Sequence, residues 1–536
     1  MRPFATAAAS VALALLTFFQ FPGHTWLQQD TQIYVPILEH LRDPAVLRND
    51  ILVQHPHVAF TLYDEIAIAS RSLTGLGFAE VLAIQQVITR ALGIWGLIMM
   101  AEAMGLGLSA ALLVAAICSL GAAITGPQVL TTEYEPTPRA FAVPLLVCAV
   151  GLVARDRLLG AGIVGALAFL YHPPTVLPFW GLLAILLVLR RKPAGLAPLP
   201  VAVAVLLITA RAAGQAMGEQ SFFAQLTPLQ EQLQRMRAGY AWISTWPHAV
   251  TVHHVILFVI LVAAWVRVRT KCPPALTFFA LGLPALGLLS MPASWLLLEQ
   301  WKWTLVPQIQ PMRTLLFTAL MMQFLTAVAG VYAVAGRRNR EAAVWCALAF
   351  LLPLHPVLTA PPEWPRFAVA LALALALAAL TVLAQWRAPL AAPAVAVAAF
   401  FAIPLAGVVN YPRLHTPELA QLSAWARSAT PADAVFLFPD AAHGVYPGIF
   451  RSEALRAVYV DWKGGGQVNY LKELGEQWWS RWQQTVGGPG GAAGFQAADM
   501  PKYETLGIQY VVVQARNRVA GAPVFENASY CAYQLR

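Results

Sequence analysis

The sequence predicts a polytopic bundle of membrane-spanning helices followed by a small α/β domain outside the membrane. Of the 536 residues, 58% are hydrophobic and only 11% are charged, and the mean hydropathy is +0.61. A soluble globular protein carries about 25% charged residues, so this chain lacks the charge needed to cover a water-facing surface. The basic residues gather in short clusters between long apolar runs. The net charge of +9 therefore indicates a membrane protein and not a nucleic-acid-binding protein.

Thirteen apolar runs are predicted to form the helices of this bundle, since a helix that crosses a bilayer needs about 20 mostly apolar residues. They cover residues 4–22, 79–99, 107–125, 139–154, 159–173, 174–189, 195–211, 251–267, 275–295, 312–335, 342–359, 365–385 and 391–409. The fifth and sixth runs are short and flank His172. They are either two helices that meet near the membrane surface or one irregular hairpin.

The positions of the basic clusters support this number of helices. Each cluster precedes the first helix or follows an even-numbered one: Arg2, Arg155, Arg157, Arg190, Arg191, Lys192, Arg267, Arg269, Lys271, Arg337, Arg338, Arg340 and Arg387. All of them therefore fall on one side, which the positive-inside rule makes cytoplasmic. We expect a cytoplasmic N-terminus, a retained first helix without a cleavage site, and an extracytoplasmic C-terminal domain.

The outer connections of the predicted membrane domain, residues 1–410, differ in length. They cover residues 23–78, 126–138, 212–250 and 296–311. In the first, Ile33 to Leu47 and Phe60 to Leu73 have apolar residues at helical spacing, which is typical of helices that lie flat at the membrane interface. The second places Glu133 and Glu135 beside the membrane, close to Arg139.

The tail, residues 411–536, has a different composition, with more charged, glycine and turn residues. Val435 to Phe438 and Tyr510 to Val513 are predicted strands, and Thr416 to Ser428 and Asn469 to Trp482 are predicted helices. Thr416 is a suitable N-cap. These elements predict a small α/β domain. The helical spacing of Trp478, Trp479 and Trp482 favours packing in a core or against the membrane surface over stacking on a sugar.

Acidic residues follow the first helix and recur in the next outer connection. They are Asp30 in Trp26-Leu27-Gln28-Gln29-Asp30, and Glu133 and Glu135 in Thr132-Glu133-Tyr134-Glu135-Pro136. This layout resembles the GT-C class of membrane glycosyltransferases, in which such residues are catalytic and the donor is a sugar on polyprenyl phosphate or diphosphate. The resemblance implies an enzyme of the bacterial inner membrane that glycosylates an envelope acceptor on the periplasmic side, with the lipid-linked donor and membrane lipid as its partners.

The tail carries a second resemblance. Phe450-Arg451, Arg456 and Val460-Asp461-Trp462-Lys463 are similar to a domain of uncharacterised bacterial membrane proteins. Asp461 and Lys463 are expected to be surface or folding residues.

Transfer of a sugar from a lipid phosphate needs a carboxylate to deprotonate the acceptor or hold a metal, and cations to stabilise the leaving phosphate. We assign Asp30 as the base, with Glu133 or Glu135 assisting it or binding a divalent metal ion. Arg139 and Arg313 are the expected phosphate ligands. Further residues expected to bind substrate are His55, His57, His172 and Gln310.

Each assignment has a simpler alternative. Asp30 suits the N-cap of the interfacial helix that follows it. Glu135 and Arg139, four residues apart, suit an ion pair that closes a loop, and Arg313 suits a side chain that extends to the membrane interface. His55 and His57 fit an ordinary loop, and His172, beside two prolines, fits a helix break.

Arg90 lies within an apolar helix, where an unpaired charge costs several kcal/mol. We therefore expect a carboxylate or several backbone carbonyls in contact with its guanidinium. Glu102, near the inner end of the same helix, is an alternative partner.

Two other functions fit the same layout. One is a transporter or flippase of lipid-linked or small molecules, although the sequence shows no internal repeat of the kind that many transporters have. The other is a non-catalytic GT-C-like protein of envelope assembly, because fold alone does not establish activity.

Overall fold

The computed structural model describes residues 2–54, 61–212, 223–358, 391–402, 414–488 and 497–535. Twelve of the thirteen predicted membrane helices have a helical counterpart there, and the run 365–385 lies outside the described residues. The helices are α1 (Arg2–Phe19), α5 (Phe78–Ala103), α6 (Leu108–Ser119), α7 (Pro138–Ala154), α8 (Leu158–Tyr171), α9 (Pro173–Arg190), α10 (Pro198–Ala212), α12 (His248–Val268), α13 (Pro274–Ser294), α15 (Leu316–Ala335), α16 (Asn339–Leu358) and α18 (Ala391–Ala402). The two short runs around His172 are separate helices, α8 and α9.

Several helices in the described part of the chain are apolar enough to lie within a membrane. Six segments are long and apolar enough to cross one: Phe78–Ala103, Pro173–Arg190, Pro193–Arg211, His248–Lys271, Pro274–Gln300 and Val306–Ala335. Shorter apolar helices, including α1 and α7, accompany them. The protein is therefore mainly α-helical, with a bundle of membrane-type helices, as the sequence predicts.

The bundle has a buried centre and an apolar exterior. Helix α15 is surrounded by other helices, and its apolar segment is wholly buried. In α10 and α12, only 22% of the apolar segment is buried. Their exposed side chains include Val201, Ile208 and Val259. Exposure of these apolar side chains to water would be unfavourable, so this surface fits contact with lipid.

Helices α5 and α7 approach each other closely through small residues. A Cβ atom added to Gly96 would lie 2.4 Å from the carbonyl oxygen of Val147, and one added to Gly151 would lie 2.6 Å from that of Gly96. Glycine at these positions lets the two backbones meet, as is common between membrane helices. This contact fixes the start of α7, where Arg139 lies, relative to α5.

The links predicted to be cytoplasmic are joined by ion pairs. Asp156, between α7 and α8, pairs at 3.4 Å with Arg190, the last residue of α9, and at 3.1 Å with Lys192, which follows α9. Arg267 at the end of α12 pairs with Glu341 at the start of α16. These contacts place basic links from distant parts of the sequence at a common end of the bundle.

The sidedness of the membrane domain remains a prediction that reporter fusions can test. A reporter fused after Arg340 is expected to lie in the cytoplasm, and one fused after Gly466 is expected to lie outside, because the basic clusters all lie on one side. Alkaline phosphatase and green fluorescent protein fusions give opposite signals in the two compartments. The same compartment for both positions would contradict the predicted helix count.

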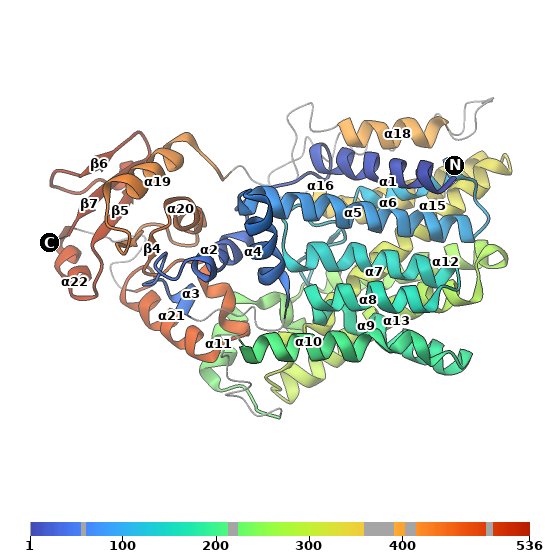
Figure 1. The fold of residues 1–536 in the computed structure, drawn as a ribbon, viewed down its shortest axis with the longest axis horizontal. Coiled ribbons are helices and arrows are strands. Elements are labelled where there is room, and N and C mark those ends of the chain that lie inside the picture. The colour runs from blue at the N-terminus through green and yellow to red at the C-terminus, as the bar shows by residue number, and fades with distance from the viewer. Residues whose placement is uncertain are drawn as a thin grey trace.

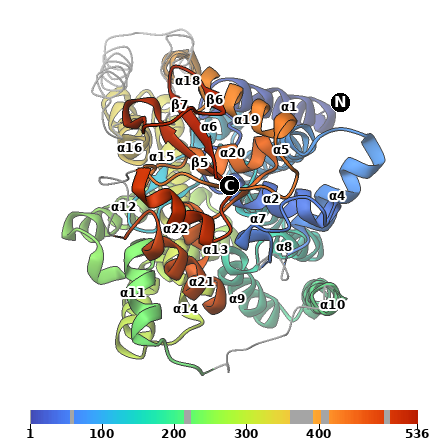
Figure 2. The ribbon, with the colours of Figure 1, turned by 90° about the vertical axis from the view of Figure 1, so that its left-hand side faces the viewer.

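The predicted outer connections contain short helices, which lie at the end of the bundle opposite to the N-terminus (Figure 1). The first connection forms α2 (Thr31–Arg42), α3 (Ile51–Gln54) and α4 (Tyr63–Thr74). The third forms α11 (Pro228–Arg237), and the C-terminal domain gathers at this same end (Figures 1 and 2).

A five-stranded mixed sheet forms the centre of the C-terminal domain. Its strand order is β4-β3-β5-β7-β6. Strand β3 (Val435–Leu437) pairs in parallel with β4 (Ala457–Val458) and β5 (Tyr510–Gln514). Strand β7 (Tyr530–Gln534) pairs antiparallel with β5 and with β6 (Phe525–Glu526). The sequence predicts β3 and β5, whereas the other three strands were not predicted.

Helices cover both faces of this sheet. Helices α19 (Pro417–Ala429) and α20 (Tyr446–Ala454) contribute to one core, which contains Phe436 and Val512. The other core contains Leu437 and Val511, together with α21 (Lys472–Gln484) and α22 (Met500–Thr505). Thr416 accepts a hydrogen bond from the backbone N–H of Leu419, as expected of an N-cap.

The second core extends beyond the C-terminal domain. Ile51 and Leu52 of α3 and Leu233 of α11 are buried in the same cluster as Trp478 and Trp482 of α21. The tryptophans are thus core residues, which agrees with their helical spacing. The outer connections and the C-terminal domain therefore share one hydrophobic core.

A buried charge cluster joins the same parts. Arg451 of α20 forms ion pairs with Asp50 (2.6 Å) and Asp461, and the side chains of all three are at most 1% exposed. Asp50 also accepts the backbone N–H of Val458 at 2.9 Å. Arg451 pairs with Asp50 of the first outer connection and with Asp461 of the C-terminal domain. The cluster therefore fixes this connection against the domain.

Candidate active site

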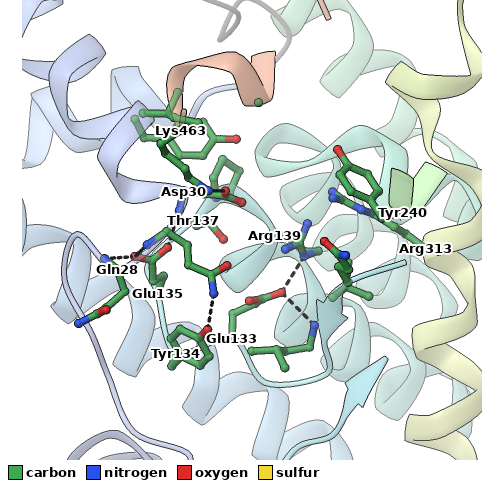
Figure 3. A pocket seen from close by; sticks show the side chains of 18 of the residues that line it. Gln28, Asp30, Glu133, Tyr134, Glu135, Thr137, Arg139, Tyr240, Arg313 and Lys463 are labelled. Atoms are coloured by element: carbon green, nitrogen blue, oxygen red, sulfur yellow. Dashed lines mark hydrogen bonds and ion pairs between the residues drawn. The ribbon is translucent and has the colours of Figure 1, made fainter. Parts of the chain in front are cut away.

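A cavity of about 750 Å³ lies where the helical bundle meets the C-terminal domain (Figure 3). Its polar lining comes from distant parts of the chain. The candidate residues that line it are Asp30, Glu133, Glu135, Arg139, His172 and Arg313. The two outer connections that carry the acidic residues therefore meet at one cavity, as their layout predicts.

Asp30 lies in this cavity directly before α2, in the N-cap position, but its side chain makes no capping hydrogen bond. The carboxylate instead forms an ion pair with Lys463 of the C-terminal domain, with 2.7 Å between Oδ1 and Nζ. The N-cap alternative is therefore wrong. Lys463 lines the cavity, and its side chain is 18% exposed. Asp461 is buried against Arg451 and fits a folding role.

The charge of Asp30 is stabilised by its surroundings. Burial alone would raise the pKa of the Asp30 carboxyl, but Lys463, and beyond it Arg139 and Arg313, bring this pKa below its usual range. The Asp30 side chain is 42% exposed, so its carboxylate remains open to the cavity. Asp30 is thus ionised and accessible at neutral pH.

Glu135 takes the capping role at the start of α2. Its two carboxylate oxygens accept the backbone N–H groups of Gln28, Gln29, Asp30 and Thr31 and the hydroxyl of Thr31. Burial, and then the Asp30 charge, raises the pKa of Glu135, and the hydrogen bonds oppose that rise. Glu135 therefore holds in place the turn that carries Asp30.

Arg139 pairs with Glu133 and not with Glu135, so the ion pair suggested by the spacing of four residues is wrong. The distance from Arg139 Nε to Glu133 Oε1 is 2.8 Å, and the same oxygen accepts the backbone N–H of Leu130. Both side chains of the pair are at least 90% buried. Figure 3 shows this pair between Asp30 and Arg313.

Arg90 reaches the same loops from within the bundle. Its guanidinium donates to the backbone carbonyls of Gly23 (2.8 Å) and Glu133 (2.6 Å), as expected for a buried arginine. Glu102 is not its partner, because that carboxylate pairs with Arg155. Arg90 therefore ties together the segments that carry the carboxylates of the cavity.

Arg313 lies in the 3₁₀ turn η6 (Pro311–Leu315) and faces the cavity. Its guanidinium stacks over the Tyr240 ring, 4.9 Å from the centroid, and its buried Nε has no hydrogen-bond partner. No carboxylate lies within ion-pair distance of it among the described residues. Arg313 thus lines the cavity with a guanidinium that forms no ion pair with a carboxylate of the described residues.

Of the four other predicted residues, Gln310 and His172 lie within the described residues and have different surroundings. Gln310 does not line the cavity, but its amide donates to the hydroxyls of Tyr240 (3.3 Å) and Tyr470 (2.8 Å), which do. His172 lines the cavity between α8 and α9, and its Nδ1 accepts the N–H of Thr175. His172 therefore both ends one helix and caps the next. His55 and His57 lie outside the described residues.

Comparisons with known proteins identify the fold. A family model described as Domain of unknown function (DUF6798) matches residues 417–485, and no curated protein matches the sequence. The crystal structure of ArnT from Cupriavidus metallidurans in the apo state aligns over 99% of this chain and 98% of that chain, with a TM-score of 0.50 and 13% identity. The same protein bound to undecaprenyl phosphate aligns over 99% and 97%, with a TM-score of 0.53 and 12% identity.

This chain has the GT-C fold. The predicted resemblance to that class is confirmed at the level of the fold, over nearly the whole chain. The part that matches the domain of unknown function includes Lys463, so this GT-C protein draws part of its cavity from that domain.

Other residues of the GT-C cavity were missed by the sequence analysis. Tyr34 lies one helical turn after Asp30, so the spacing of α2 could have indicated it. Lys463 belongs to the motif noted in the tail. Tyr240 and Tyr470 could not be recognised as cavity residues from the sequence, because they are far from the acidic residues along the chain. Burial raises the pKa of Tyr34 and Tyr470, so both hydroxyls stay neutral and can donate hydrogen bonds.

The carboxylates of the cavity do not fit a divalent metal ion as they are arranged. Asp30 contacts an ammonium group, Glu133 a guanidinium and Glu135 a row of N–H groups. Among the described residues, no cluster of three or more His, Cys, Asp or Glu side chains could hold a metal.

Proposed function

We propose that this protein is a membrane glycosyltransferase that moves a sugar from a polyprenyl-phosphate or diphosphate carrier to an envelope acceptor on the outer side of the inner membrane. The observation that carries the proposal is the cavity itself. An accessible carboxylate, Asp30, and a cation that has no carboxylate partner in the described part of the chain, Arg313, line one cavity at the end of an apolar bundle with the GT-C fold. The ArnT structure with undecaprenyl phosphate supports a polyprenyl carrier.

The residues have separate roles in this reaction. Asp30 accepts the proton of an acceptor hydroxyl as that oxygen attacks the anomeric carbon of the sugar. The bond between the anomeric carbon and the phosphate oxygen breaks, and the carrier phosphate leaves with the electron pair. Arg313, with Arg139 in the same cavity, binds the phosphate of the donor and keeps it bound as it leaves, so its contribution falls mainly on donor binding. Glu133 and Glu135 support the site by orienting Arg139 and the turn at Asp30.

A transfer assay with purified protein tests the proposal. The full chain in lipid nanodiscs is incubated with radiolabelled polyprenyl-phosphate sugars and a membrane extract. We expect the label to move from the carrier lipid to an acceptor in the extract. Absence of transfer with every sugar donor would contradict the proposal. A transporter would instead carry the intact labelled lipid across sealed vesicles without breaking the sugar–phosphate bond.

Replacing Arg313 with alanine is expected mainly to weaken donor binding. A hydrogen bond to a charged group contributes about 1.5–3 kcal/mol, so KM for the donor should rise about 10- to 100-fold, with a smaller change in kcat. Steady-state kinetics with varied donor concentration measures the two constants. Arg340→Ala, an exposed arginine in the predicted cytoplasmic link, is the control. A large fall in kcat at unchanged KM would contradict this role.

A further inference from the structure

The segment Asp461–Gly464 of the C-terminal domain is held rigidly at the edge of the cavity. Asp461 forms its buried ion pair with Arg451, its carbonyl accepts the indole N–H of Trp478 at 2.8 Å, and its carboxylate accepts the N–H of Gly464 at 3.2 Å. Each of these contacts is buried. The backbone on both sides of Lys463 is therefore fixed in position.

The membrane domain holds the same segment from the other side. Arg237, at the end of α11, stacks 3.6 Å from the centroid of the Trp462 ring and donates to the Trp462 carbonyl. A Cβ atom on Gly465 would lie 2.4 Å from the Trp478 ring and 2.9 Å from Arg237 Nε. This packing leaves the segment little freedom to move, so the direction of the Lys463 side chain is set by its surroundings.

We infer that Lys463 is a positioning residue for the transfer reaction: it keeps the Asp30 carboxylate charged and oriented in the cavity. The inference rests on the proposed function. Its geometric basis is the 2.7 Å ion pair between Lys463 and Asp30, together with the rigid segment that presents the lysine. It gives the domain of unknown function a role, since this domain completes the active site with a charge that the membrane domain lacks at this position.

The other groups around Asp30 do not replace Lys463. The titratable and charged groups that act on Asp30 or are acted on by it come from every neighbouring element: Lys463, Arg139, Arg313, Glu135, Tyr34, Tyr134 and Tyr470. Arg139 is already paired with Glu133, and Arg313 lies beside Tyr240. Among the described residues, Lys463 is the one cation in hydrogen-bond contact with the Asp30 carboxylate.

The pH dependence of transfer distinguishes a positioning role from a structural one. Because Lys463 favours the charged form of Asp30, removing its charge raises the pKa of Asp30. Activity that needs ionised Asp30 is lost as the pH falls through that pKa, so the acid limb of the kcat profile moves to higher pH. A merely structural role would lower the amount of folded protein without moving this limb.

The experiment compares Lys463→Met, Lys463→Arg and the control Lys472→Met over about pH 4 to 8. Lys472 is an exposed lysine of the same domain, at the start of α21. We expect Lys463→Met to lower kcat at least tenfold and to shift the acid limb of the kcat profile to higher pH. Lys463→Arg should keep most of the wild-type kcat and most of the wild-type position of the acid limb. Lys472→Met should behave as wild type. A wild-type kcat profile for Lys463→Met would overturn the inference.

A second measurement does not depend on activity. Thermal unfolding of Asp30→Asn, Lys463→Met and the double variant gives their coupling. If the contact exists, the two shifts in Tm at neutral pH are not additive, and the coupling shrinks in acid as Asp30 becomes protonated. Additive shifts at neutral pH would overturn the inference. If the two substitutions are coupled but the wild-type protein transfers no sugar, the proposed function alone is overturned.

Discussion

Asp30→Asn is expected to abolish sugar transfer, with a loss on the order of 10²-fold or more in kcat, because asparagine keeps the size of the side chain but cannot accept the proton. The backbone N–H of residue 30 still reaches Glu135, so the turn before α2 keeps its cap. Transfer rates with the radiolabelled donor measure the loss, and size-exclusion chromatography shows whether the variant folds.

Asp433→Asn is the matched control for this substitution. The Asp433 side chain is 42% exposed, as is that of Asp30, and it also pairs with one cation, Arg48, but it lies outside the cavity. The control is expected to transfer sugar at the wild-type rate. If Asp30→Asn retains more than about one tenth of the wild-type kcat, Asp30 is not the base.

Arg451→Met is expected to destabilise the C-terminal domain by about 3–5 kcal/mol, because it leaves the carboxylates of Asp50 and Asp461 buried without their cation. Its effect should reach the cavity, since Asp461 begins the segment that presents Lys463. Limited proteolysis and thermal unfolding of the full chain in nanodiscs measure the loss.

The control for Arg451 is Arg518→Met, which breaks an exposed ion pair with Glu526 in the same domain. Exposed pairs contribute about 0–1 kcal/mol, so this variant should resist protease nearly as well as wild type. Equal protease resistance of the two variants would show that the buried cluster does not hold the domain in place.

Hydropathy predicted the bundle well, because the length and composition of a membrane helix are constrained within the helix itself. The same is true of β3 and β5, which are short apolar runs. Strands β4 and β6 have two residues each, too few for an alternating pattern. They exist because longer neighbouring strands pair with them, so their own residues carry little signal.

The acidic residues of the cavity were also predictable, since Asp30 and the Glu133 loop each leave an apolar helix at the same membrane level. Their partners were not. The spacing rule that linked Glu135 to Arg139 applies within a helix, but α7 begins only at Pro138. The loop before it turns Glu135 toward α2 and Glu133 toward Arg139. Lys463 is 433 residues from Asp30, and only the tertiary fold brings them together.

The shared core of α3, α11 and the C-terminal sheet has a consequence for how the chain is made. Synthesis proceeds from the N-terminus, so Ile51, Asp50 and Leu233 are made long before the strands that pack on them. These residues lack their packing partners until the last quarter of the polypeptide has been synthesised. The C-terminal domain, in turn, lacks part of its hydrophobic core without α3 and α11. An excised gene fragment for residues 414–535 would therefore yield a product with an open apolar face, and the two portions depend on each other for solubility.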